Sequence, residues 1–238
     1  MRPMLTIAAR EYLSFFRSPT GWVVLALYLL MTGYTFVAAT IRPGAPATMA
    51  TLFAVSQWLL LTVAPAISMR LMSEELRSNT IEPLMASPVG DPSIVVGKYL
   101  GALGYLGTLL GATLVHVVAL EAIADPDYGP IFTGYAGLLL TGALYVAVGL
   151  VFSAMSSSQV VAFLLTVSFF FALHVASTQG AASAPEPWSG LLYELSIQMR
   201  LRDFSQGVFE TRHAVFFVAT SAFAVVLASL LVESRRWR

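Results

Sequence analysis

The sequence has no cysteine and very little charge. Without cysteine, the chain forms no disulfide, has no thiolate nucleophile and offers no cysteine ligand to a metal. Charged residues make up 11% of its 238 residues, against about 25% in an ordinary soluble domain. The net charge is zero, which argues against the basic stripe of a nucleic-acid binder, so no nucleic-acid partner is expected. Hydrophobic residues supply 57% of the chain, and this composition predicts a polytopic membrane protein.

Six long apolar stretches can each cross a bilayer as a helix. A span needs about 20 apolar residues to cross about 30 Å of hydrocarbon, and in lipid its backbone must satisfy its own hydrogen bonds. We therefore expect an all-α membrane protein with a single transmembrane domain over residues 1–238, in which Pro65 kinks the second span. The expected spans are residues 21–41, 50–71, 97–120, 131–153, 159–179 and 214–232.

Lysine and arginine predict the orientation. An even number of spans puts both termini on one side, together with Arg2, Arg10, Arg17, Arg70, Arg77, Lys98, Arg235, Arg236 and Arg238. Arg42, Arg200, Arg202 and Arg212 fall on the other side. The positive-inside rule then places both termini in the cytoplasm, in a bacterial inner membrane. We do not expect a cleaved signal peptide, because the first apolar run is about twice as long as a signal core.

Residues 3–18 are predicted to form an amphipathic helix in the headgroup plane. Leu5, Ala9, Tyr12 and Phe16 follow one face, and Arg10, Ser14 and Arg17 follow another. The candidate functional residues of this helix are Arg10, Tyr12, Phe16 and Arg17. The helix is either an anchor for the first span or a lever toward a cytoplasmic partner.

The external segment, residues 180–213, is too long for a simple connector. The spacing of Tyr193, Ile197, Leu201, Phe204 and Val208 predicts one or two helices that pack flat on the bundle. Arg200, Arg202, Asp203 and Arg212 are expected on the solvent side. An auxiliary extracytoplasmic subunit is a candidate partner for this segment.

The loop of residues 72–96 contains an unusual concentration of charge, in "EELRSNTIEPLMASP". We expect a short helix over about residues 81–86, with Ile81, Leu84 and Met85 forming an apolar ridge rimmed by charge. Such a surface is typical of a protein contact site. The alternative is a helix that only packs on the membrane surface.

"MRLMSEELRSNTIEPLMASPVGDPSIVVGKYLGAL" resembles the loop between the second and third spans of ABC-2 type permeases, especially the gliding-motility-type subfamily. "EYLSFFRSPTGWVV", "SSSQVVAF" and "DFSQGVFETRHAVFF" resemble other segments of that family in the same order. The resemblance implies a type V exporter-like fold and a homo- or heterodimer with its interface at spans one and five. It also implies a separate ATP-binding cassette ATPase subunit that holds ATP and Mg.

In this family the loop carries a coupling helix that docks on the ATPase. The resemblance therefore implies ATPase-coupling contacts at Glu74, Glu75, Arg77, Thr80, Ile81, Glu82, Leu84 and Met85. Pro83 departs from the family pattern, which usually has an apolar residue at this position. The chain itself has no phosphate-binding loop, because "GDPSIVVGKY" has Pro92 and Tyr99 where that motif needs Gly and Ser or Thr. No cofactor is expected in this chain.

Polar residues inside the spans leave a second function open. Gln57, His116 and His174 are either hydrogen-bonding contacts between helices or, with Glu121, the polar centre of an intramembrane enzyme. A non-transporting scaffold with a permease-like fold is a third alternative. A stripe of glycines in the third span is predicted to allow close helix packing: Gly97, Gly101, Gly104 and Gly111.

Overall fold

The computed structural model describes residues 2–41, 47–78 and 90–234. Its regular elements are all helices, with no strand among the described residues, so the predicted fold class is confirmed. Six helical stretches are long and apolar enough to cross a membrane. They are α2 (Pro19–Ala39), α3 with α4 (Ala50–Ser68, Arg70–Arg77), α6 with α7 (Asp91–Ala112, Leu114–Glu121), α8 (Tyr128–Met155), α9 with η1 and α10 (Gln159–Val175, Ala176–Gly180, Ala181–Ser183) and α13 (Thr211–Ser234).

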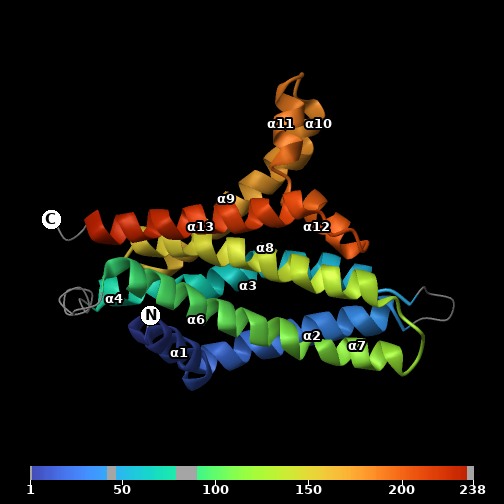
Figure 1. The fold of residues 1–238 in the computed structure, drawn as a ribbon, viewed down its shortest axis with the longest axis horizontal. Helices are drawn as coiled ribbons and strands as arrows, with labels where there is room; N and C mark the ends of the chain where they lie inside the picture. The colour runs from blue at the N-terminus through green and yellow to red at the C-terminus, as the bar shows by residue number, and fades with distance from the viewer. Residues whose placement is uncertain (1, 42–46, 79–89, 235–238) are drawn as a thin grey trace.

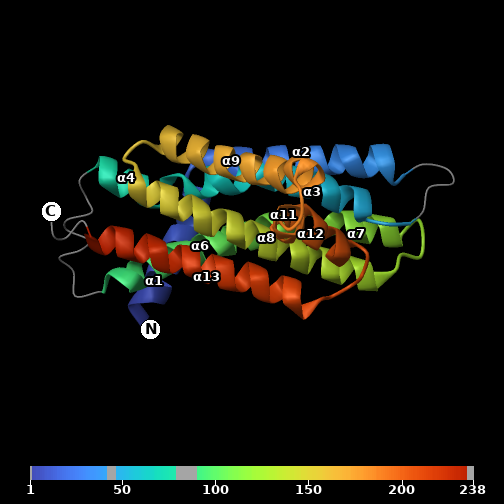
Figure 2. The ribbon, with the colours of Figure 1, turned by 90° about the horizontal axis from the view of Figure 1, so that it is seen from above.

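Helix α8 lies at the centre of the bundle, with most of the other long helices running beside it (Figures 1 and 2). Two thirds of its most apolar stretch is buried (67%), against 17% for α2. Small residues on α8 make this burial possible, because they let neighbouring side chains reach its backbone. A Cβ on Gly142 would lie 2.7 Å from the Leu106 side chain, and one on Gly137 would lie 2.7 Å from Leu201.

Helix α1 (Arg2–Arg17) lies across one end of the bundle, at the end where α4 stops and α13 finishes (Figures 1 and 2). The predicted helix is therefore present, and its predicted apolar face is divided, since Leu5 and Ala9 are exposed whereas Tyr12 and Phe16 are half-buried. Phe15 is buried, whereas Leu5 and Leu13 are exposed. The face toward α6 includes Ile7 and Glu11 instead. Leu5, Ala9 and Leu13 form an outward apolar stripe, as expected for a helix whose other side packs on protein.

The helices of the second and third spans are each interrupted once. The second breaks at Met69, between α3 and α4, four residues after Pro65. The third breaks at Thr113, between α6 and α7. Both spans run further than predicted, from residue 50 to 77 and from residue 92 to 121.

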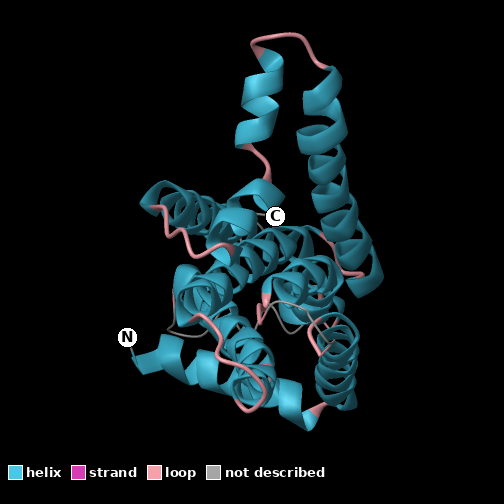
Figure 3. Cartoon of the chain, turned by 90° about the vertical axis from the view of Figure 1, so that its right-hand side faces the viewer, coloured by secondary structure: helices cyan, strands magenta, loops and turns pink. Residues whose placement is uncertain are grey.

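The predicted external segment is only partly correct. Helix α12 (Ile197–Ser205) packs on α8 and buries Ile197, Leu201 and Phe204. Helix α11 (Trp188–Glu194) has no buried residue and packs on η1 and α10, with which it projects away from the bundle (Figures 1 and 3). Tyr193 and Val208 are exposed, so the predicted apolar face is limited to α12.

Candidate coupling surface and intramembrane polar sites

Three of the four candidate packing glycines lie where α1 crosses α6: Gly97, Gly101 and Gly104. A Cβ on Gly101 would lie 2.7 Å from the Ala8 carbonyl oxygen, and one on Gly97 would lie 2.9 Å from the Met4 carbonyl oxygen. Backbone oxygens cannot rotate away, so only glycine allows α1 to lie this close to α6.

Gly111 is not part of this contact. A Cβ there would meet nothing within 4 Å, so its predicted packing with the other three does not hold among the described residues. Tyr12 extends the α1–α6 contact instead, since its hydroxyl lies 3.0 Å from Thr108 Oγ1 and its ring lies over Gly104. Phe16 is half-buried and packs edge-on against both Tyr12 and Trp22.

Lys98 joins three helices through an ion cluster that the sequence patterns did not single out. Its ammonium lies 2.5 Å from Glu75 Oε1 of α4 and 3.2 Å from Glu11 Oε2 of α1. The Lys98 side chain is only 2% exposed. A buried charge is stable only when it is paired, so α1, α4 and α6 must stay together at this point. The available signal was one lysine in a glycine-rich helix whose other charged residue, Asp91, stands at its start.

The break between α3 and α4 is held by a serine from α8. Ser153 Oγ accepts the backbone N–H groups of Met72 and Ser73, each at 3.0 Å, and donates to the Met69 carbonyl at 2.9 Å. The Ser153 hydroxyl thus replaces backbone hydrogen-bond partners within the helix, as inserted side chains do at kinks. One turn away, a Cβ on Gly149 would lie 2.8 Å from Ser68 Cβ, so the Ser68 side chain packs directly on the backbone of α8.

The residues predicted to couple to an ATPase divide into three groups. Glu74 and Arg77 are exposed on α4, whereas Glu75 is turned inward toward Lys98. The interfacial-helix candidates Arg10 and Arg17 are also exposed, and they lie on α1 at the same end of the bundle. The remaining candidates lie outside the described residues: Thr80, Ile81, Glu82, Leu84 and Met85.

His116 forms a local contact at the break in the third span. Its Nδ1 lies 2.9 Å from the Thr113 carbonyl oxygen, so Nδ1 carries the proton and donates. Its ring packs 5.2 Å from that of Phe36 on α2. Glu121 has a different partner, because it accepts the Tyr128 hydroxyl at 2.5 Å.

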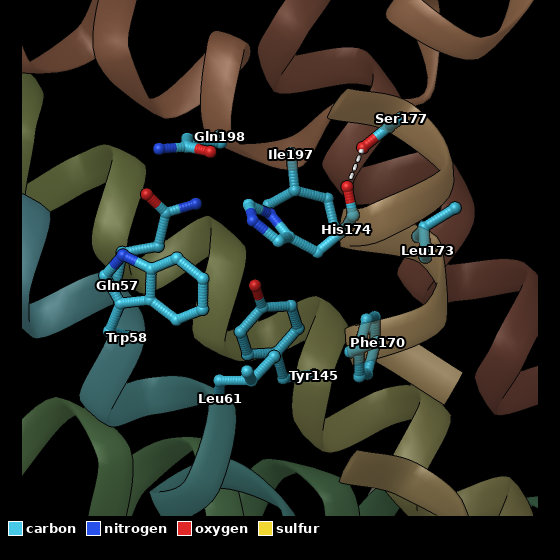
Figure 4. Close-up of a pocket in the computed structure, with 10 residues that line it drawn as sticks. All are labelled: Gln57, Trp58, Leu61, Tyr145, Phe170, Leu173, His174, Ser177, Ile197 and Gln198. Atoms are coloured by element: carbon cyan, nitrogen blue, oxygen red, sulfur yellow. Dashed lines mark hydrogen bonds between the residues drawn. The ribbon is translucent and has the colours of Figure 1, made fainter. Parts of the chain in front are cut away.

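His174 lines a small cavity between α3, α8, α9 and α12 (Figure 4). The side chains of Gln57, Tyr145 and Gln198 face the same space, and the Trp58 ring packs 4.7 Å from the imidazole. The cavity volume is about 20 Å³, close to the roughly 10–15 Å³ that one water needs. This space is too small for a cargo molecule.

The polar residues proposed for an intramembrane enzyme are not brought together. His116 packs on α2, His174 packs on α3 and Glu121 binds Tyr128. Within the described ranges, no group of three His, Asp or Glu side chains is placed to hold a metal. The predicted polar centre is therefore wrong for these residues, and the enzyme alternative has no structural support.

Arg200 is buried at the opposite end of the bundle, although the sequence predicted that it would be solvated. Its guanidinium donates to the Glu194 carbonyl and, at 2.9 Å, to His213 Nδ1, and it stacks 4.0 Å from the Phe216 ring. Burial lowers the pKa of Arg200 below its usual range, and Glu194 partly opposes that shift. Arginine remains charged, so this cluster fixes α12 against α13.

The fold and these sites together define a polytopic helical membrane protein. A family model described as ABC-2 family transporter protein matches residues 43–199, more than half of the chain. The chain therefore belongs to the ABC-2 transporter family and is a membrane-spanning permease component of an ABC transporter. The matched residues include α4, Lys98 and Ser153. No curated protein matches the chain.

Proposed function

We propose that this chain is the permease subunit of an ATP-driven exporter, and that a separate ATP-binding subunit docks at the end formed by α1 and α4. The exposed Glu74 and Arg77 on α4 and the exposed Arg10 and Arg17 on α1 support this proposal. The segment expected to carry the coupling helix, residues 79–89, follows α4 directly. Under the positive-inside rule this end is cytoplasmic, in a bacterial inner membrane.

The observation that carries the proposal is the Lys98 cluster. A force applied to α4 by a bound ATPase reaches α1 and α6 through Glu75, Lys98 and Glu11. It reaches α8 through Ser153. Interfaces packed this closely respond as rigid units, so small movements at the docking surface are transmitted to the spans. In this reading α1 is a lever as well as an anchor.

A second permease subunit, identical or different, is the other partner that we propose. Helices α2 and α9 are the least buried spans, at 17% and 22% of their most apolar stretches. Their exposed apolar side chains form broad faces, among them Val23, Leu27, Leu30, Val160, Leu164 and Phe171. A partner's matching spans would cover these faces at the expected interface of spans one and five.

Charge reversal on α4 tests the docking proposal. Glu74→Lys and Arg77→Glu should each reduce co-purification of a co-expressed ATP-binding subunit, because both side chains are exposed at the proposed contact. The matched control is Arg202→Glu, which changes an exposed residue of α12 at the other end of the bundle. Unchanged capture by both α4 variants would refute the proposed docking surface. If the chain were instead a non-transporting scaffold, it would not change the rate of ATP hydrolysis by the captured subunit.

A further inference from the structure

A second cavity, of about 320 Å³, lies at the α1 end of the bundle. It lies where α1 turns into α2 and where α3 passes into α4, with the start of α9 beside it. Polar side chains at this cavity are Ser18, Thr20, Arg70, Glu74 and Gln159. Its other walls are apolar and include Val24 and Ile67. The cavity therefore combines opposite charges with a hydrocarbon surface.

Arg70 is held in place without a carboxylate partner among the described residues. Its guanidinium donates to Ser14 Oγ at 3.0 Å and stacks 4.0 Å from the Phe15 ring. Five N–H donors are available on a guanidinium, and the recorded Ser14 bond uses one. The remaining donors can bind a phosphate through two parallel hydrogen bonds, the geometry that arginine favours.

Glu74 lies one helical turn beyond Arg70 on α4 and lines the same cavity. One turn corresponds to a rise of about 5.4 Å. Glu74 is exposed and has no ion-pair partner in the described part of the chain. The cavity thus offers a cation and an anion from one helix, as a zwitterionic headgroup with a phosphate and an amine requires.

The surroundings of this cavity favour a place in the headgroup layer. It begins where the crosswise helix α1 meets the first span, and α1 presents Leu5 and Leu13 outward. Trp22, one turn into α2, is 56% exposed and donates from Nε1 to the Phe16 carbonyl at 2.8 Å. Indole rings are enriched at the membrane interface. Val24 and Ile67 then lie deeper, on the side of the acyl chains.

We propose that this cavity binds the headgroup of a phospholipid with a primary amine. The phosphate binds Arg70 and the one hydroxyl proton that the hydrogen bond between Ser18 and Thr20 leaves free. The ammonium binds Glu74, and the first acyl carbons contact Val24 and Ile67. A quaternary amine has no N–H to donate to Glu74, and an uncharged glycerol headgroup carries no positive charge for it. Free inorganic phosphate makes no apolar contact. The binding does not depend on the docking proposal above.

Native mass spectrometry of the full chain in detergent tests this inference. The chain is titrated with phosphatidylethanolamine, phosphatidylglycerol and phosphatidylcholine of identical acyl chains. We expect phosphatidylethanolamine to bind about tenfold more tightly than the other two, the effect of one charge-assisted hydrogen bond. Arg70→Gln should weaken all three lipids about tenfold or more, and Glu74→Gln should abolish the preference among them. Arg77→Gln removes a charge from the same helix outside the cavity and should change nothing.

A cavity-filling variant provides an independent check, because Arg70→Gln also removes the Ser14 contact. Ala66→Phe places a ring in the cavity and keeps Arg70, so it should displace the lipid without changing the charge. Equal lipid retention by wild type, Arg70→Gln and Ala66→Phe would overturn the proposal. Displacement of bound lipid by excess inorganic phosphate would also overturn it, by assigning the cavity to a free anion.

Discussion

Lys98 Nζ lies 2.5 Å from Glu75 Oε1, and this contact joins the third span to the extension of the second. Glu11 of α1 completes the cluster from the other side, at 3.2 Å. A residue expected to contact an ATPase thus stabilises the permease itself. The coupling region is built from an inner set of paired charges and an outer set of exposed ones.

Loss of the lysine charge should be costly. We expect Lys98→Met to lower the free energy of unfolding by about 3–5 kcal/mol, because it leaves two largely buried carboxylates without a cation. Thermal unfolding of the purified chain in detergent measures this change. Adding Glu11→Gln and Glu75→Gln to Lys98→Met should restore most of the loss. A Lys98→Met protein as stable as wild type would contradict the ion cluster.

Two glycines of the α6 stripe should respond oppositely to alanine. Gly101→Ala places a methyl group 2.7 Å from the Ala8 carbonyl and should destabilise by about 1–3 kcal/mol, with α1 becoming more accessible to protease. Gly111→Ala meets nothing within 4 Å and should stabilise by about 0.5–1 kcal/mol through helix propensity. Equal effects at both positions would argue against the α1–α6 contact. Thermal unfolding and limited proteolysis provide the comparison.

Ser153 should be more sensitive than other helical hydroxyls. Ser153→Ala leaves the buried N–H groups of Met72 and Ser73 without their acceptor, so we expect a loss of about 1–3 kcal/mol. Thr220 on α13 bonds only within its own helix, to the Phe216 carbonyl, and Thr220→Ala serves as the control. Hydrogen exchange at residues 69–73 should accelerate in Ser153→Ala alone. Unchanged exchange there would exclude a role for Ser153 at the break.

The guanidinium shape of Arg200 should matter beyond its charge. Arg200→Lys keeps a cation but cannot donate to both Glu194 and His213 while stacking on Phe216, so a loss of about 1–3 kcal/mol is expected. Arg202→Lys, on the same helix but exposed, should change stability by less than about 0.5 kcal/mol. Similar melting temperatures for the two variants would mean that α12 is not fastened through this cluster.

The sequence predicted the outward side of the helices better than the side that packs against neighbouring helices. The outward apolar faces follow from hydropathy, and the six spans were found within a few residues. For α1 the sequence shows the apolar stripe of Leu5 and Ala9, whereas the side that packs on α6 is set by the glycines of α6. Arg200 was placed in solvent because a pattern of charges on one helix does not show which of them a neighbouring helix covers.

Composition and apolar run length by themselves determined that this chain is a multi-pass membrane protein with six candidate spans among its described residues, because lipid imposes the same length and backbone constraint on every span. Only the tertiary structure decided which polar groups meet. Lys98 and Glu11 are 87 residues apart in the sequence, and Ser153 lies 81 residues from Met72. Their pairing depends on how helices pack, and packing follows from close contacts between surfaces that no single helix contains.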